Sequence, residues 1–195
     1  MQKAILSMIF ALGFACAAQA AETHGAHEHG AAKMNISVEQ DTVTIELDSP
    51  LDNILGFEHA PKTAKQRAAV QAMARRLHRA DTLFVFTPAA KCALKTVTLE
   101  SEKLDDALLQ GKREKQKAAP AQGTSDAAPA EGDHDGHGDL EAVFTFACAA
   151  PRSLKSIDVL LFKEYKGMQE IEVQLVTPDK QVSAELTPKS TTLRW

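Results

Sequence analysis

The sequence predicts an α+β fold that is rich in strands, with mainly antiparallel sheets, one principal helix and a flexible linker that contains histidine and aspartate. Three observations support this fold class. Many short segments alternate apolar and polar residues with a period of two, which is typical of half-buried strands. One segment, 63–80, repeats its apolar residues at helical spacing. Residues 110–138 contain no large apolar side chain and cannot bury enough surface to offset the entropy of ordering.

Residues 1–20 have the features of a secretory signal peptide. Lys3 precedes an almost wholly apolar run over 4–17, and a small-x-small cleavage site follows at 18–20. The apolar run is too short for a stable membrane span. A lipid anchor on Cys16 is disfavoured, because the residues before it lack the expected leucine. We therefore expect an exported, periplasmic protein without membrane insertion.

The mature chain is expected to begin with a mobile, histidine-rich N-terminus over residues 21–32. Segments 33–39 and 42–47 then alternate as two strands, joined by a turn at Gln40-Asp41. The residues that follow the second strand, 51–61, are expected to form a loop that leads into the helix.

The principal helix is predicted from Thr63 to about Ala80. Gln66 stands three residues after Thr63, as in a capping box. Strands at 81–86 and 92–101 complete an N-terminal α/β part over 33–109. The apolar stripe of the helix consists of Val70, Met73, Ala74 and Leu77.

A C-terminal β part over 139–195 follows the linker at 110–138 and is expected to pack on the first part. Its segments again alternate with a period of two. The predicted strands are 139–148, 154–162, 170–176, 181–186 and 191–195.

Two cysteines, Cys92 and Cys148, follow the signal peptide. In an oxidising compartment, an even count without a CxxC pair first indicates a disulfide. A thiolate metal site is the alternative, but such sites usually contain Cys or His at close spacing, which neither residue has.

Charge and motif content argue against several classes of function. The formal net charge is −4, and one unit more negative without Lys3, which argues against nucleic acid and anionic membrane surfaces as partners. The sequence contains no HExxH, GxSxG, phosphate loop or dinucleotide fingerprint. We therefore predict a protein that is not an enzyme. A zinc-dependent hydrolase remains an alternative, because three histidines and a water could activate hydrolysis.

Histidine supplies the strongest chemical signal in the chain. Five of the seven histidines lie in two polar clusters rich in glycine and alanine. Neutral imidazole with carboxylate support and no thiolate suits Zn²⁺, Cu²⁺ or Ni²⁺. Solvated tails without metal are the alternative for both clusters. The candidate ligands are His24, His27, His29, Asp133, His134, Asp135 and His137.

Glu58 and His59 belong to the loop before the helix, and loops held by rigid elements often carry binding residues. A metal-ligand role and a structural hydrogen bond remain equally open for this pair. His78 lies on the helix between Arg76 and Arg79, a positive setting that disfavours a cation and favours a structural or exposed role.

The chain resembles the ZrgA family, periplasmic zinc-binding proteins long described as a domain of unknown function. The resemblance lies in the order of its segments: the histidine-rich N-terminus, the GFEH stretch, the isolated Cys92, the linker with histidine and aspartate, and the C-terminal strands with the LTP stretch. The resemblance covers essentially the whole mature chain, and the GFEH and LTP stretches are its most specific parts. It implies zinc binding, a part in zinc acquisition alongside an uptake transporter, and a compact mixed α/β fold. It supports His24, His27, His29 and His59 most. The linker has only two histidines, where relatives can have many more.

The predicted function is therefore periplasmic zinc binding, by a monomer that buffers zinc or delivers it to a zinc ABC importer or its binding protein. The imidazoles of His24, His27 and His29 leave one position of a tetrahedral zinc ion open. Glu58, His59 or a linker histidine could fill it. A copper or nickel chaperone is the alternative. Signal cleavage one residue later would make Glu22 the N-terminal residue and His24 the third. An N-terminal amine with histidine in third position forms a square-planar nitrogen site, which copper and nickel prefer.

Overall fold

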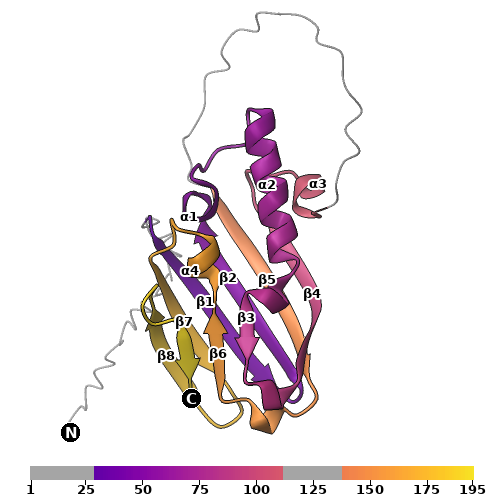
Figure 1. Cartoon of the computed structure of the whole chain (residues 1–195), viewed down its shortest axis with the longest axis vertical. Helices are drawn as coiled ribbons and strands as arrows, with labels where there is room; N and C mark the ends of the chain where they lie inside the picture. The colour runs from indigo at the N-terminus through magenta and orange to yellow at the C-terminus, as the bar shows by residue number, and fades with distance from the viewer. Residues whose placement is uncertain (1–28, 112–137) are drawn as a thin grey trace, which may run out of the picture.

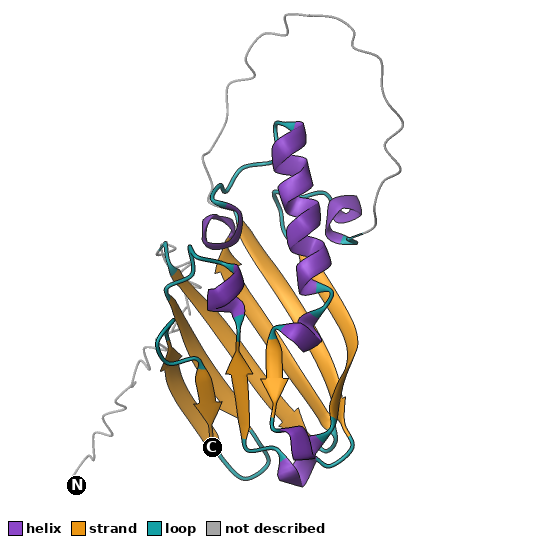
Figure 2. Ribbon diagram, viewed as in Figure 1, coloured by secondary structure: helices purple, strands orange, loops and turns teal. Residues whose placement is uncertain are grey.

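The computed structural model describes residues 29–111 and 138–195, which form two sheets and several short helices (Figures 1 and 2). The larger sheet has six strands in the order β4-β5-β2-β1-β7-β8. These are β1 (Ala31–Glu39), β2 (Thr42–Pro50), β4 (Cys92–Glu100), β5 (Asp139–Cys148), β7 (Glu170–Val176) and β8 (Gln181–Leu186). The smaller sheet has the order β3-β6-β9, with β3 (Phe84–Phe86), β6 (Ser156–Val159) and β9 (Thr192–Arg194). The predicted strand-rich α+β class is confirmed.

The helices are short apart from one. They are α1 (Leu51–Leu55), α2 (Ala64–Leu77), α3 (Asp106–Leu109) and α4 (Leu161–Glu164), with 3-10 turns at Ala80–Thr82, Pro88–Ala90 and Pro151–Ser153. No helix in residues 29–111 or 138–195 is long and apolar enough to cross a membrane.

The two halves of the chain share both sheets. β5 lies between β4 and β2, and β7 pairs in parallel with β1, while all other pairings are antiparallel. In the smaller sheet, β6 lies between β3 and β9. Strands from before and after residues 112–137 therefore hydrogen-bond to one another throughout the fold.

One face of the six-stranded sheet carries the core. Alternate residues of β1, β2, β5 and β7 are buried, as the period of two requires. The smaller sheet and α2 cover this face (Figure 1). Phe84 packs against Phe144 with ring centroids 5.1 Å apart, and Phe86 lies 4.6 Å from Phe146. Most of the described side chains of the opposite face are exposed or half-buried.

Helix α2 begins with the predicted capping box. The Thr63 hydroxyl accepts the Gln66 N–H at 3.1 Å, and the Gln66 side chain accepts the Thr63 N–H at 3.1 Å. The helix ends at Leu77, slightly before the predicted end. His78 follows as its C-cap, and its Nε2 lies 2.9 Å from the Leu109 carbonyl. A carbonyl can only accept, so Nε2–H donates and ties α2 to α3. This is the structural role predicted for His78.

The predicted disulfide is present. Cys92 and Cys148 stand directly opposite each other at one end of the β4–β5 ladder, and their sulfurs are bonded. The bond joins the strand that precedes residues 112–137 to the strand that follows them.

Several segments differ from the sequence prediction. The strand predicted over 81–86 begins only at Phe84, because a 3-10 turn at Ala80–Thr82 precedes it, and residues 31–32, expected in the mobile N-terminus, begin β1. Residues 51–55, expected as loop, form α1, which ends at Gly56 in the left-handed conformation with φ 75°. Residues 160–162, expected at the end of a strand, leave β6 and enter α4, where the consecutive residues Leu161 and Phe162 are both buried. Short apolar runs carry too little periodicity to separate these states.

Candidate metal site

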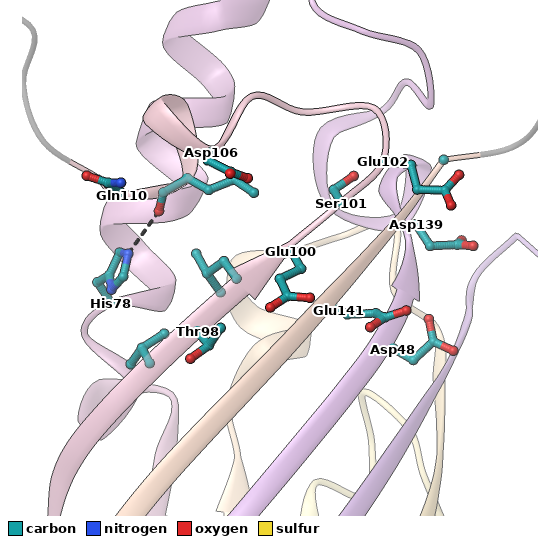
Figure 3. Close-up of a pocket in the computed structure, with 14 residues that line it drawn as sticks. Asp48, His78, Thr98, Glu100, Ser101, Glu102, Asp106, Gln110, Asp139 and Glu141 are labelled. Atoms are coloured by element: carbon teal, nitrogen blue, oxygen red, sulfur yellow. Dashed lines mark hydrogen bonds between the residues drawn. The ribbon is translucent and has the colours of Figure 1, made fainter.

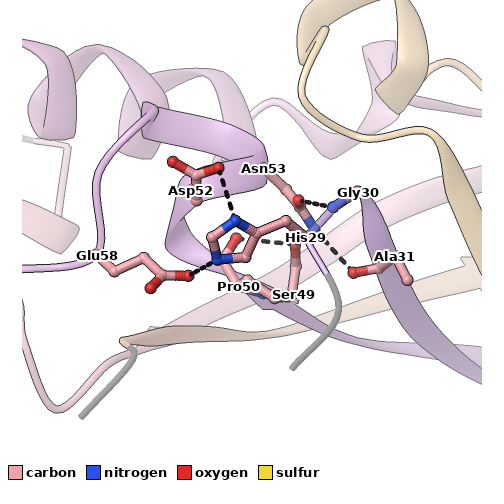
Figure 4. A network of polar contacts seen from close by, with 8 residues as sticks. All are labelled: His29, Gly30, Ala31, Ser49, Pro50, Asp52, Asn53 and Glu58. Carbon is pink, nitrogen blue, oxygen red and sulfur yellow. Dashed lines mark hydrogen bonds and ion pairs between the residues drawn. The ribbon is translucent and has the colours of Figure 1, made fainter. Parts of the chain in front are cut away.

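His29 is the first described residue and lies between two carboxylates at the start of β1 (Figure 4). Its Nε2 is 3.2 Å from Glu58 Oε1, and its Nδ1 is 3.7 Å from Asp52 Oδ2. Asp52 belongs to α1, and Glu58 to the loop after it. The imidazole is 55 % exposed and the Glu58 side chain only 15 %. The pair therefore combines a mostly buried carboxylate with an imidazole that is open to solvent.

The contact between His29 and Glu58 has the length of an ion pair or hydrogen bond, and this length is also compatible with two ligands on one zinc ion. Zinc bonds to nitrogen and oxygen are about 2.0–2.1 Å long, so neighbouring ligands in a tetrahedron lie about 3.3–3.4 Å apart. The observed 3.2 Å is close to this value. Asp52 Oδ2 lies on the side of the other ring nitrogen at 3.7 Å, which is an ion-pair distance and too long for a hydrogen bond.

These side chains do not form a complete metal site by themselves. In the described part of the chain, no three His, Cys, Asp or Glu side chains are placed so that they could hold one ion. Asp52 faces the ring nitrogen opposite to the one that faces Glu58, so both carboxylates cannot share an ion with His29. Any ion bound here needs further ligands.

His59 is exposed and has a fixed tautomer when neutral. Its Nδ1 lies 2.8 Å from the Ala60 carbonyl, and its ring stacks on Phe57 with centroids 5.2 Å apart. Because the carbonyl accepts, Nδ1 carries the proton and Nε2 keeps its lone pair for a metal. The two alternatives for His59 are thus compatible, since one nitrogen makes a structural hydrogen bond while the other stays available.

The chain re-enters the described structure close to Glu58. The Leu51 N–H donates to the Gly138 carbonyl at 2.8 Å, and a Cβ on residue 138 would collide with the Glu58 carbonyl. His29 and Gly138, which directly follow the two undescribed segments, therefore both lie beside Glu58. The remaining predicted ligands lie outside the described residues: His24, His27, Asp133, His134, Asp135 and His137.

An acidic groove of about 1080 Å³ lies next to this region (Figure 3). It runs along the ends of β4, β5 and β2 and reaches α3. Its lining includes six carboxylates: Asp48, Glu100, Glu102, Asp106, Asp139 and Glu141. Such a surface raises the local concentration of cations.

Sequence reasoning identified His29 and Glu58 but missed Asp52. The spacing between His29 and Asp52 in the chain is not that of a local motif, and only the placement of α1 against the start of β1 brings them together.

Comparisons with known proteins agree with this chemistry. Residues 26–195 match the family model described as ZrgA family zinc uptake protein. A search of curated proteins found no match. Because the family model covers most of the chain, including His29, Asp52, Glu58 and His59, the chain belongs to the ZrgA family of zinc uptake proteins.

Proposed function

We propose that this protein binds zinc in the periplasm and buffers it or delivers it for uptake by a transporter. The observation that carries the proposal is the pair of His29 Nε2 and Glu58 Oε1, held 3.2 Å apart with Asp52 behind the ring. The family's role in zinc uptake supports zinc as the metal. In this proposal the protein binds a cargo ion and catalyses no reaction.

His24, His27, His29 and His59 are the proposed principal ligands, with Glu58 as a fifth candidate. His24 and His27 are five and two residues away from the described His29, so a short stretch of chain can bring them to the same ion. Asp133, His134, Asp135 and His137 would add weaker capacity, since residue 138 lies beside Glu58.

An exposed site suits transfer of the metal. His29 is more than half exposed and His59 lies at the surface, so two of the four proposed principal ligands are accessible from solvent. A receiving protein could approach these imidazoles and exchange ligands one at a time. We propose a zinc ABC importer or its binding protein as the recipient, and a monomer as the delivering form.

Calorimetry with zinc tests the assignment. The combined alanine variant of His24, His27, His29 and His59 should lose at least 100-fold in affinity, because three or four imidazole bonds disappear. His78→Gln is the matched control. It removes a histidine but can still donate to Leu109, so zinc affinity should not change. Undiminished affinity in the combined variant would refute the site. Because Cu²⁺ outcompetes Zn²⁺ at most nitrogen sites, the cargo is tested by metal analysis of protein purified from the periplasm, and copper without zinc there would refute zinc as the cargo.

A further inference from the structure

Asn53 is buried beneath the start of β1, with 2 % of its surface exposed. Its Oδ1 accepts the Gly30 N–H at 2.6 Å, and its Nδ2 donates to the Ala31 carbonyl at 2.8 Å and to Ser49 Oγ at 3.2 Å (Figure 4). Gly30 and Ala31 lie far from Asn53 in the sequence, and Ser49 belongs to β2, the strand before α1. A buried primary amide with this many partners holds one fixed orientation.

The side-chain amide of Asn53 continues the β1–β2 ladder beyond its last pair of residues. The paired residues of these strands end at Lys33 and Asp48, and the same register would place Ala31 opposite Pro50. Proline has no N–H to donate. Asn53 supplies the missing donor to the Ala31 carbonyl and an acceptor for the Gly30 N–H, as a peptide group of a neighbouring strand would.

Gly30 is held from its other side as well. Its carbonyl accepts the N–H groups of Gln169 at 2.7 Å and Glu170 at 2.9 Å. Its φ of 95° favours glycine, so the backbone adopts a turn that few other residues allow. The residue directly after His29 is therefore fixed by both of its polar backbone groups, and Asn53 provides the bond on the α1 side.

We propose that Asn53 is a positioning residue for the metal site. By fixing Gly30, it determines where the His29 backbone stands and keeps the imidazole between Asp52 and Glu58. This inference rests on the proposed function, in which His29 is a zinc ligand. Asn53 itself touches no metal and acts through the backbone of its neighbour, in the way that supporting hydrogen bonds preorganise a ligand.

The test compares Asn53→Ala with Asn35→Ala. Asn35 is the only other asparagine of the chain and is exposed on β1, so its variant is the matched control. Without metal, hydrogen exchange at the Gly30 amide should become at least tenfold faster in Asn53→Ala and stay unchanged in Asn35→Ala. With zinc ions as the probe, Asn53→Ala should lower affinity about tenfold, within the range for supporting groups of metal ligands.

A double-mutant cycle separates positioning from a general effect on the fold. If Asn53 acts through His29, then Asn53→Ala should cause no further loss of zinc affinity in a His29→Ala background. An equal loss in both backgrounds would overturn the inference, and so would unchanged exchange at Gly30. Where Asn53→Ala fails to fold, Ser49→Ala removes one of the three Asn53 bonds, the one from Nδ2 to Ser49 Oγ, together with the bond from the Ser49 hydroxyl to the Pro50 carbonyl. It should give a smaller loss that again vanishes without His29, and no loss would overturn the inference.

The same data distinguish this inference from the proposed function. Unchanged zinc affinity in the single His29→Ala variant would refute the His29 site and the inference with it. A loss in His29→Ala without a loss in Asn53→Ala would refute the positioning role alone and leave the zinc site intact.

Discussion

At the scale of single residues, the two nitrogens of His29 have different surroundings and therefore different roles. Nε2 faces a mostly buried carboxylate, Glu58, and Nδ1 faces a more exposed one, Asp52. The sequence identified the histidine and Glu58, because both lie in recognisable stretches. It could not identify Asp52 or Asn53, because their roles depend on α1, a helix of one to two turns that was expected to be loop.

Tyr165 is a second residue whose environment decides its chemistry. It is the only tyrosine of the chain and is 8 % exposed at the end of α4. No residue in the described ranges forms a hydrogen bond with its hydroxyl. Burying a polar group without a partner costs about 1–3 kcal/mol. We therefore expect Tyr165→Phe to unfold at a higher urea concentration at pH 7, with Tyr165→Leu, which loses ring packing, unfolding at a lower one.

The same burial predicts how stability depends on pH. Burial raises the pKa of the Tyr165 hydroxyl above its ordinary value of 10.0, while nearby Arg76 opposes the shift and Glu164 adds to it. Folding thus favours the protonated form, and this contribution is complete below pH 10 and is lost as the pH rises above it. The free energy of unfolding of wild type relative to Tyr165→Phe should fall between pH 10 and pH 12. A constant difference in urea unfolding across that range would contradict the shift.

At the scale of elements, one row of charges crosses the exposed face of the large sheet. The register aligns Glu185, Glu172, Lys33, Asp48, Glu141 and Glu100 across β8, β7, β1, β2, β5 and β4. Five of these six exposed side chains are acidic. Like charges directly opposite each other destabilise a sheet, so this row lowers stability while it gathers negative charge next to the candidate site.

Glu141 has a carboxylate on each side, Asp48 and Glu100, and it offers the clearest test of this row. Glu141→Lys should raise the free energy of unfolding by about 0.5–1 kcal/mol at low salt, because two repulsive pairs become attractive. The gain should shrink in about 1 M salt. Glu46→Lys is the control, since Glu46 stands opposite Asn35 and Val143 and has no opposing carboxylate. Equal gains in both variants, measured by urea unfolding, would contradict repulsion within the row.

Elements with a strong local signal were predicted well from the sequence. The β1–β2 hairpin and α2 follow from alternation and from the capping box, and β7 and β8 have the predicted bounds. The misses are short elements. α1 and α4 contain five and four residues, and their conformation is set by packing against other parts of the chain rather than by a pattern of their own. The candidate site depends on α1, so its geometry could not be predicted.

At the scale of the whole molecule, the order of strands makes the two halves of the chain interdependent. Residues 29–111 contribute β1 to β4, and residues 138–195 contribute β5 to β9. Without the second half, β4 and β2 lose the strand between them, and β3 loses its partner β6. The buried face of the large sheet would also lose its cover. We infer that neither half folds alone.

This interdependence predicts the outcome of a cut between the halves. Residues 112–117 contain four lysines and arginines, so trypsin has several sites there. Brief digestion should give a product that remains one molecule, because Cys92–Cys148 and the shared sheets hold both fragments together. A gel without reductant should show one band near the original mass, and a gel with reductant should show two.

The cut protein should also keep the proposed zinc site, because His29, Asp52, Glu58 and His59 all precede the cut and residue 138 stays bonded to Leu51. Calorimetry on the cut protein should therefore give the affinity of the intact chain within about threefold. Cys92→Ser with Cys148→Ser is the matched variant. Its fragments should separate under denaturing conditions without reductant but stay together in native buffer. Separation in native buffer would show that the shared sheets alone cannot hold the halves, and that the disulfide is required for the assembled fold.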